Sequence, residues 1–141
     1  MILDISSLRS AYTALSKSLG FLYSDLASNP DLREQFRAAS IQGFEFTHEL
    51  AFKMLKRQLE QMVADPAEVD KMTYMEIIRS GAEAGLITDV GRFKDYRDKR
   101  NITSHPYNQG KAEFIVAVLQ DFAEDILYLL TLLAAPWLLR Q

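Results

Sequence analysis

The chain has 141 residues, of which 48% are hydrophobic and 25% charged, a balance typical of one globular domain with a buried core. It has no cysteine, which excludes a disulfide framework, a thiolate metal site and a cysteine nucleophile. The formal net charge of −3 argues against nonspecific coating of nucleic acid, which depends on many lysine and arginine contacts to phosphates. We therefore expect one domain over residues 1–141, on which a local basic site remains possible.

The first predicted helix runs from Ile5 to about Ala27. Its apolar residues recur at intervals of three and four, which places them on one face of a helix. Pro30 cannot continue this helix, and its neighbours Asn29 and Asp31 are suited to a turn or a helix cap. The apolar face consists of Ile5, Leu8, Tyr12, Leu15, Leu19, Leu22 and Leu26.

The second predicted helix is long, from Asp31 to about Val63, and Asp65-Pro66 closes it or begins a loop. Charged side chains four positions apart form a stripe along it, which is the spacing of ion pairs between successive helical turns. This stripe consists of Glu45, Glu49, Lys53 and Arg57.

A short third helix is predicted to begin after Thr73, because Thr73 and Glu76 have the spacing of a capping box. Gly85 is suited to end it in the left-handed conformation. Asp89 can then cap a fourth helix that continues to about Ser104 or His105. It should end there, because the next residue is a proline.

The last predicted helix extends from Lys111 to about Ala134 and is apolar on nearly all sides in its second half. Such a helix must be covered all round, and in so small a protein a second subunit would cover it. Its most apolar stretch, Ile126–Leu139, is shorter than the ~20 residues of a membrane span and contains Pro136. Together with the absence of strand patterns and of a signal peptide, this predicts an all-α, homodimeric up-and-down bundle of four main helices and one short helix, without membrane association.

The polar helix end at residues 100–107 is the strongest candidate for function. The chain has two histidines, His48 and His105, and no common zinc-binding spacing. The Walker A, Gly-x-Gly-x-x-Gly and Gly-x-Ser-x-Gly motifs are also absent. These absences argue against a self-contained nucleotide-binding enzyme and a serine hydrolase.

Within this segment, Arg100 offers a fork of donors that matches phosphate, and His105 titrates near neutral pH. Five residues apart, they lie roughly 140° around a regular helix, so the helix must break before Pro106 to bring them together. Asn101 and Ser104 add short polar groups. Spacing alone leaves an ordinary capped helix end as an open alternative.

Residues 100–108, Arg-Asn-Ile-Thr-Ser-His-Pro-Tyr-Asn, resemble the Arg-x4-6-His signature of the HEPN superfamily, in its Arg-x4-His-x-Tyr form. Residues 41–56 resemble the Phe-Glu-Phe/Tyr-Thr-x-Glu-Leu-Ala-Trp/Phe-Lys helix of the nucleotidyltransferase substrate-binding proteins, which are the HEPN half of HEPN/MNT pairs. Residues 83–87 resemble the Ala-Gly-Leu-Ile segment of the same family. The resemblance covers residues 41–133.

This resemblance implies a homodimeric ribonuclease toxin in the cytoplasm of a prokaryote, with RNA rather than DNA as its substrate. Arg100 and His105 would be the catalytic pair, and Asn101 and Ser104 would support them. Tyr107 would receive AMP from an MNT-type nucleotidyltransferase antitoxin, and this transfer would inactivate the toxin. ATP and Mg belong to that partner, so neither a cofactor nor a metal is expected in this chain.

Two features of the second helix complete these expectations. His48 stands where the family more often has an aromatic residue, and we expect a structural role for it, as a polar patch on the dimer face or a tolerated substitution. Glu45 and Glu49 are expected to support the site as ion-pair or dimer-contact residues rather than as catalytic groups. A non-catalytic substrate-binding subunit remains the alternative function, and a plain helical dimer is a third.

Overall fold

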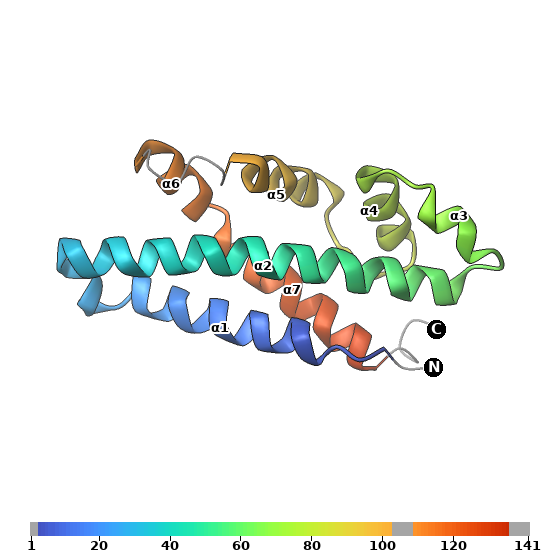
Figure 1. Ribbon diagram of the computed structural model, residues 1–141, viewed down its shortest axis with the longest axis horizontal. Coiled ribbons are helices and arrows are strands. Elements are labelled where there is room, and N and C mark those ends of the chain that lie inside the picture. Colours follow the sequence, from blue (N-terminus) through green and yellow to red (C-terminus); the bar gives the residue numbers. More distant parts are fainter. Residues whose placement is uncertain (1–2, 103–108, 136–141) are drawn as a thin grey trace.

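The computed structural model describes residues 3–102 and 109–135, which form seven α-helices, one 3-10 helix and no strand (Figure 1). The predicted all-α class is therefore confirmed. The elements are α1 (Ser6–Leu22), η1 (Asp25–Ser28), α2 (Pro30–Met62), α3 (Pro66–Asp70), α4 (Tyr74–Glu83), α5 (Val90–Ile102), α6 (Gln109–Val116) and α7 (Leu119–Ala134).

The long helix α2 is the centre of the bundle (Figure 1). Helix α1 lies antiparallel along one side of α2, and the shorter helices α3 to α6 follow one another along the other side. Helix α7 runs behind this pair and contacts both α1 and α2. Within the described residues, no helix is long and apolar enough to cross a membrane.

Several helix boundaries follow from local hydrogen bonds. The Asn29 side chain accepts from the backbone amides of Asp31 and Leu32 at 2.9 and 3.1 Å, and so caps α2. Thr73 and Glu76 form the predicted capping box of α4, with both bonds at 3.2 Å. These signals lie within three residues of the boundaries they set, which explains why the sequence alone predicted them.

The boundaries of α5 agree in part with the prediction. Gly85 has a φ of 83° and lies between α4 and α5, in the conformation that favours glycine. The side chain of Asp89 accepts from the backbone amide of Arg92 at 3.1 Å, as expected of a cap. The described part of α5 ends at Ile102. The predicted continuation to Ser104 or His105 lies outside the described residues.

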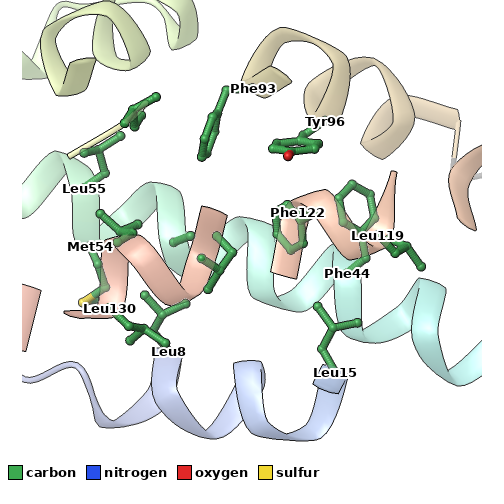
Figure 2. Close-up of a cluster of buried hydrophobic side chains, with 14 of the residues drawn as sticks. Leu8, Leu15, Phe44, Met54, Leu55, Phe93, Tyr96, Leu119, Phe122 and Leu130 are labelled. Atoms are coloured by element: carbon green, nitrogen blue, oxygen red, sulfur yellow. The ribbon is translucent and has the colours of Figure 1, made fainter. Parts of the chain in front are cut away.

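The core joins α1, α2, α5 and α7 (Figure 2). Phe122 of α7 makes edge-to-face contacts with Phe44 of α2 at 4.8 Å and with Tyr96 of α5 at 5.1 Å, measured between ring centroids. Leu8 and Leu15 of α1 are completely buried, Leu15 below the Phe44 ring and Leu8 farther along α1, on the side of Leu130. Edge-to-face pairs add a specific geometry to apolar burial, so this cluster fixes the position of α5 relative to the long helices.

The first predicted helix is longer than the observed one. Helix α1 ends at Leu22, and residues 25–28 form a separate 3-10 turn. Ser24 has extended backbone angles, and its hydroxyl donates to the Phe21 carbonyl at 2.7 Å, so the chain turns toward α2. As a consequence, Leu26 is 52% exposed and does not extend the apolar face of α1.

The last predicted helix, Lys111 to Ala134, is in fact two helices. Residues 117 and 118 form a turn between α6 and α7 although neither is glycine or proline. Helix α6 contacts α2 and α5, whereas α7 contacts α1 and α2, so different neighbours require different helix directions. One further short helix, α3, begins at Pro66, where the sequence predicts the end of a helix or the start of a loop.

The second half of α7 is covered mainly by its own chain. Ile126, Leu129, Leu130 and Leu133 are buried, whereas Leu127 and Tyr128 are at least 40% exposed. The apolar surface left on this helix is therefore narrower than the sequence suggested. The homodimer stays a prediction.

Candidate functional site

The structure places two of the predicted site residues, Arg100 and Asn101, in the last turn of α5. His105, Ser104 and Tyr107 lie outside the described residues, so the pairing of Arg100 with His105 stays a prediction. The Arg100 side chain is partly exposed at this helix end. A guanidinium in this position is accessible to a phosphate from solvent.

Helix α5 is attached to α7 by a buried carboxylate. Asp125 of α7 is 7% exposed and accepts a hydrogen bond from the Tyr96 hydroxyl and another, at 3.2 Å, from Arg92. Burial, followed by this hydrogen bond, raises the pKa of Tyr96, which keeps the hydroxyl protonated as a donor. The buried charge is thus paired with a cation and a hydroxyl, as a buried carboxylate requires.

Contacts also hold the helices on both sides of residues 103–108. Lys99, near the end of α5, is buried, binds Asp95 at 2.7 Å and lies 3.8 Å from the centroid of the Phe114 ring of α6. The neighbouring Glu113 binds Arg37 of α2 at 3.1 Å. The two helices that flank the motif segment are therefore fixed to one another and to α2.

The two carboxylates predicted to support the site lie in ion pairs. Glu45 Oε2 is 3.7 Å from Arg100 Nη1, which joins α2 to the end of α5. Glu49 Oε1 is 3.5 Å from Lys53 Nζ, one helical turn along α2. Their functional role stays a prediction.

His48 links three helices from inside the protein. Its Nε2 atom is 3.0 Å from the Tyr74 hydroxyl of α4, and this hydroxyl donates to the Phe93 carbonyl of α5 at 2.9 Å. Because the hydroxyl has one proton, His48 Nε2–H must be the donor to Tyr74 when Tyr74 donates to Phe93. His48 therefore serves as a buried connection between α2, α4 and α5.

The surroundings of His48 keep it neutral. The side chain is 9% exposed, and burial, with a smaller contribution from the nearby Arg100 charge, lowers the pKa of His48 to about 4. Burial also raises the pKa of Tyr74. Neither group is ionised near neutral pH, and both keep the hydrogen bonds that hold α4 against α5.

A shallow depression of about 370 Å³ lies where α2, α4 and the end of α5 meet. This depression brings the motif residues Arg100 and Asn101 together with side chains that the sequence does not mark as site residues. Two of these residues, Lys53 and Tyr74, belong to the charged stripe of the second predicted helix and to the capping box of the third. The sequence pattern does not indicate that they lie close together. The lining residues are His48, Glu49, Phe52, Lys53, Tyr74, Arg100 and Asn101.

Metal-binding groups are not gathered here. Across residues 3–102 and 109–135, no three His, Asp or Glu side chains are grouped so that they could hold a metal ion. The depression instead combines two cations and one carboxylate with an amide, an imidazole and two aromatic rings. Such a set is suited to bind a phosphate beside a planar group.

Comparisons with known proteins agree on one family. Residues 3–135 match the family model described as nucleotidyltransferase substrate binding protein like. A protein from Haemophilus influenzae named "Probable ribonuclease HepT" is 42% identical over 93 residues, which are 66% of this chain and 64% of that relative. The chain therefore matches a little less than two thirds of the relative's length.

One solved structure, also from Haemophilus influenzae, resembles almost the whole chain. Its title describes the fold of a substrate binding domain of a nucleotidyltransferase. The TM-score is 0.83 at 32% sequence identity, and the match covers 93% of this chain and 99% of the other. The helical arrangement described above is thus shared with that protein.

Proposed function

This chain belongs to the family of nucleotidyltransferase substrate-binding-like proteins, and we propose that it is a HEPN-type toxin that cleaves RNA without a metal ion. The observation that carries the proposal is the position of Arg100. It begins an Arg-x4-His motif at the partly exposed end of a helix that is fixed to the core. The ribonuclease name of the relative with 42% identity supports the same activity.

In the proposed reaction the RNA supplies its own nucleophile. The 2′-OH attacks the adjacent phosphorus, loses its proton to a base, and displaces the 5′-oxygen, which receives a proton. His105 transfers a proton as base or acid, and Arg100 stabilises the charge that develops on the phosphate oxygens. DNA lacks the 2′-OH, so RNA is the expected substrate.

The second histidine is unsuited to this role. His48 is buried, is bonded to Tyr74 and has its pKa lowered to about 4. Asn101 and Ser104 are assigned as supporting residues beside Arg100. Two copies of the motif across a homodimer axis would concentrate positive charge in one cleft, and an acidic protein could thereby hold RNA locally.

The proposed regulator is an MNT-type nucleotidyltransferase in the same cytoplasm. It would bind ATP and Mg and transfer AMP to Tyr107, which adds a negative phosphate and a bulky base beside the motif. The charge repels the RNA phosphates and the base blocks access. The family's association with nucleotidyltransferases supports this partner.

The nuclease proposal is tested with protein purified without its partner and incubated with RNA in EDTA. We expect cleavage by the wild type, and a loss of at least about 100-fold in Arg100→Ala and in His105→Ala, the scale of a removed acid–base or electrostatic group. Lys17→Met, an exposed charge change on α1, serves as the control and should cleave normally. The nuclease proposal would be contradicted if the wild type did not cleave RNA, or if the wild type and His105→Ala cleaved it equally.

A non-catalytic subunit is the second candidate, because the matching solved structure is described as a substrate binding domain of a nucleotidyltransferase. Coexpression with such an enzyme and intact-mass measurement separate the two. Adenylate mass on the wild type but not on Tyr107→Phe supports regulation by AMP transfer, with Tyr128→Phe as a control tyrosine. A stable complex with neither added mass nor RNA cleavage supports the binding subunit.

A further inference from the structure

The depression between α2, α4 and the end of α5 has features that the proposed chemistry does not use. Catalysis as proposed needs Arg100 there and the support of Asn101, but five other side chains line the same surface. Those side chains come from α2 and α4, far from the motif in sequence. Their chemistry indicates what the depression binds.

One wall of the depression is aromatic and held in place. The rings of Phe52 and Tyr74 stack at 5.2 Å with 22° between their planes, and the Arg97 guanidinium lies 5.2 Å from the Tyr74 centroid. The hydrogen bonds of the Tyr74 hydroxyl to Phe93 and His48 hold the outer end of this ring in place. An aromatic wall held in this way favours the flat face of a planar ring such as a nucleobase.

Two cations line the polar side of the depression, Lys53 and Arg100. Their carboxylate partners are 3.5 and 3.7 Å away, and all four side chains are at least about one third exposed. Ion pairs that are so long and so well hydrated contribute little stability, so a phosphate can take the place of the carboxylates. A phosphate also accepts several charge-assisted hydrogen bonds at once.

The side chain of Asn101 also lines the depression, and its amide group contains both donors and an acceptor. This is the pattern needed to bind the polar edge of a base. The volume of about 370 Å³ falls in the range of small-ligand sites, which is roughly 300–1,000 Å³. The aromatic wall, the cations and the amide together match the face of a base, the phosphate and the polar edge of the base in a nucleotide.

We propose that this depression binds one nucleotide unit of an RNA chain, with the base against the Phe52 and Tyr74 wall and the phosphate on the side of Lys53 and Arg100. The choice of RNA as the source of the nucleotide rests on the proposed ribonuclease function. The recognition itself rests on the side chains described above. The site thus determines which nucleotide stands beside the motif, and so the base preference of cleavage.

The test measures binding apart from cleavage. Uniformly 15N-labelled wild-type protein is titrated with each of the four ribonucleoside 5′-monophosphates and with inorganic phosphate. We expect amide shifts concentrated around the lining residues. Phe52→Leu should weaken nucleotide binding at least about fivefold, the lower end of base–aromatic stacking, and leave phosphate binding unchanged. Lys53→Met should weaken both.

Matched controls are available in the same chain. Phe46→Leu changes a 61% exposed ring on α2 outside the depression, and Lys17→Met removes an exposed charge on α1. Both should bind nucleotide like the wild type. Lys53 is solvent-exposed, so its variant should stay folded even if Phe52→Leu does not, and it provides an independent readout. Shifts located elsewhere, or unchanged nucleotide binding by both Phe52→Leu and Lys53→Met, would overturn the proposal.

Two further measurements distinguish RNA from free nucleotide as the ligand, and distinguish failure of the subsite proposal from failure of the nuclease proposal. A trinucleotide with 2′-O-methyl groups, which cannot be cleaved, should displace the monophosphate; failure to displace it would overturn RNA as the source. Cleavage with the same base preference in wild type and Phe52→Leu would overturn the subsite and leave the nuclease intact. Nucleotide binding at the depression without any RNA cleavage would support the subsite and contradict the nuclease.

Discussion

At the scale of single residues, His48 is a position noted in the sequence whose role the structure makes clear. It is buried against the rings of Phe44 and Phe122. It keeps a polar function there, because its Nε2 atom bonds the Tyr74 hydroxyl. The structural role expected of His48, as a polar patch on a dimer face or a tolerated substitution, is in this structure a buried polar link within one chain.

The pH dependence of folding tests this link. The pKa of His48 is lowered from 6.5 to about 4, so the unfolded chain binds the proton more tightly. Its contribution to stability is fully present above pH 6.5 and is lost as the pH falls toward 4, with a loss of about 2 kcal/mol at pH 5. Urea unfolding at pH 7 and pH 5 should show this loss in the wild type and a smaller one in His48→Phe. Equal losses in the two proteins would contradict a neutral, buried His48.

At the scale of secondary-structure elements, the position of α5 depends on its attachment to α7. Tyr96 and Arg92 of α5 share one buried acceptor, Asp125. Arg92 also approaches the exposed Asp121 at 3.8 Å. These two aspartates lie one turn apart on α7 and differ mainly in burial, which makes them a matched pair.

Asp125→Ala should destabilise the protein by about 2–3 kcal/mol, because it leaves a buried hydroxyl without its acceptor and removes the partner of a cation. Asp121→Ala should change the stability by less than about 1 kcal/mol, as expected for an exposed pair. Urea denaturation measures both values. In Asp125→Ala, amide hydrogen exchange should accelerate more in α5 than in the other helices. Similar losses of stability in Asp125→Ala and Asp121→Ala would contradict the attachment of α5 to α7 through Asp125.

At the scale of the whole molecule, the core is one continuous cluster. Phe122 is completely buried and its ring meets side chains from α2 and α5, so it joins helices from three parts of the chain. Phe46 is on α2 as well but is 61% exposed. The same substitution at these two positions compares a central with a peripheral ring.

Phe122→Ala should cost about 3–5 kcal/mol, the usual effect of removing a fully buried aromatic ring. Phe46→Ala should cost less than about 0.5 kcal/mol if this surface is exposed in solution. Denaturant unfolding followed by circular dichroism gives both values. A cost at Phe46 close to that at Phe122 would instead show that another surface covers Phe46, such as a second copy of the chain.

The sequence by itself determined the helical class, the main helices and several of their boundaries. The caps at Thr73 and Asp89 and the stop at Gly85 agree with the prediction, and Asn29 caps α2 where a turn or a cap was expected. A cap or a stop acts on backbone groups only a few residues away, so its signal is local. A local motif also points to Arg100 as a site residue, and this role stays a prediction. All of these signals are contained in short stretches of chain.

Only the tertiary structure decided the turn between α6 and α7, the exposure of Leu26 and the burial of His48. It also brought Phe52 and Lys53 of α2, Tyr74 of α4 and Arg100 of α5 to one depression. The physical reason is that each of these features depends on which helices pack against one another. Such long-range contacts leave no signal in the spacing of neighbouring residues.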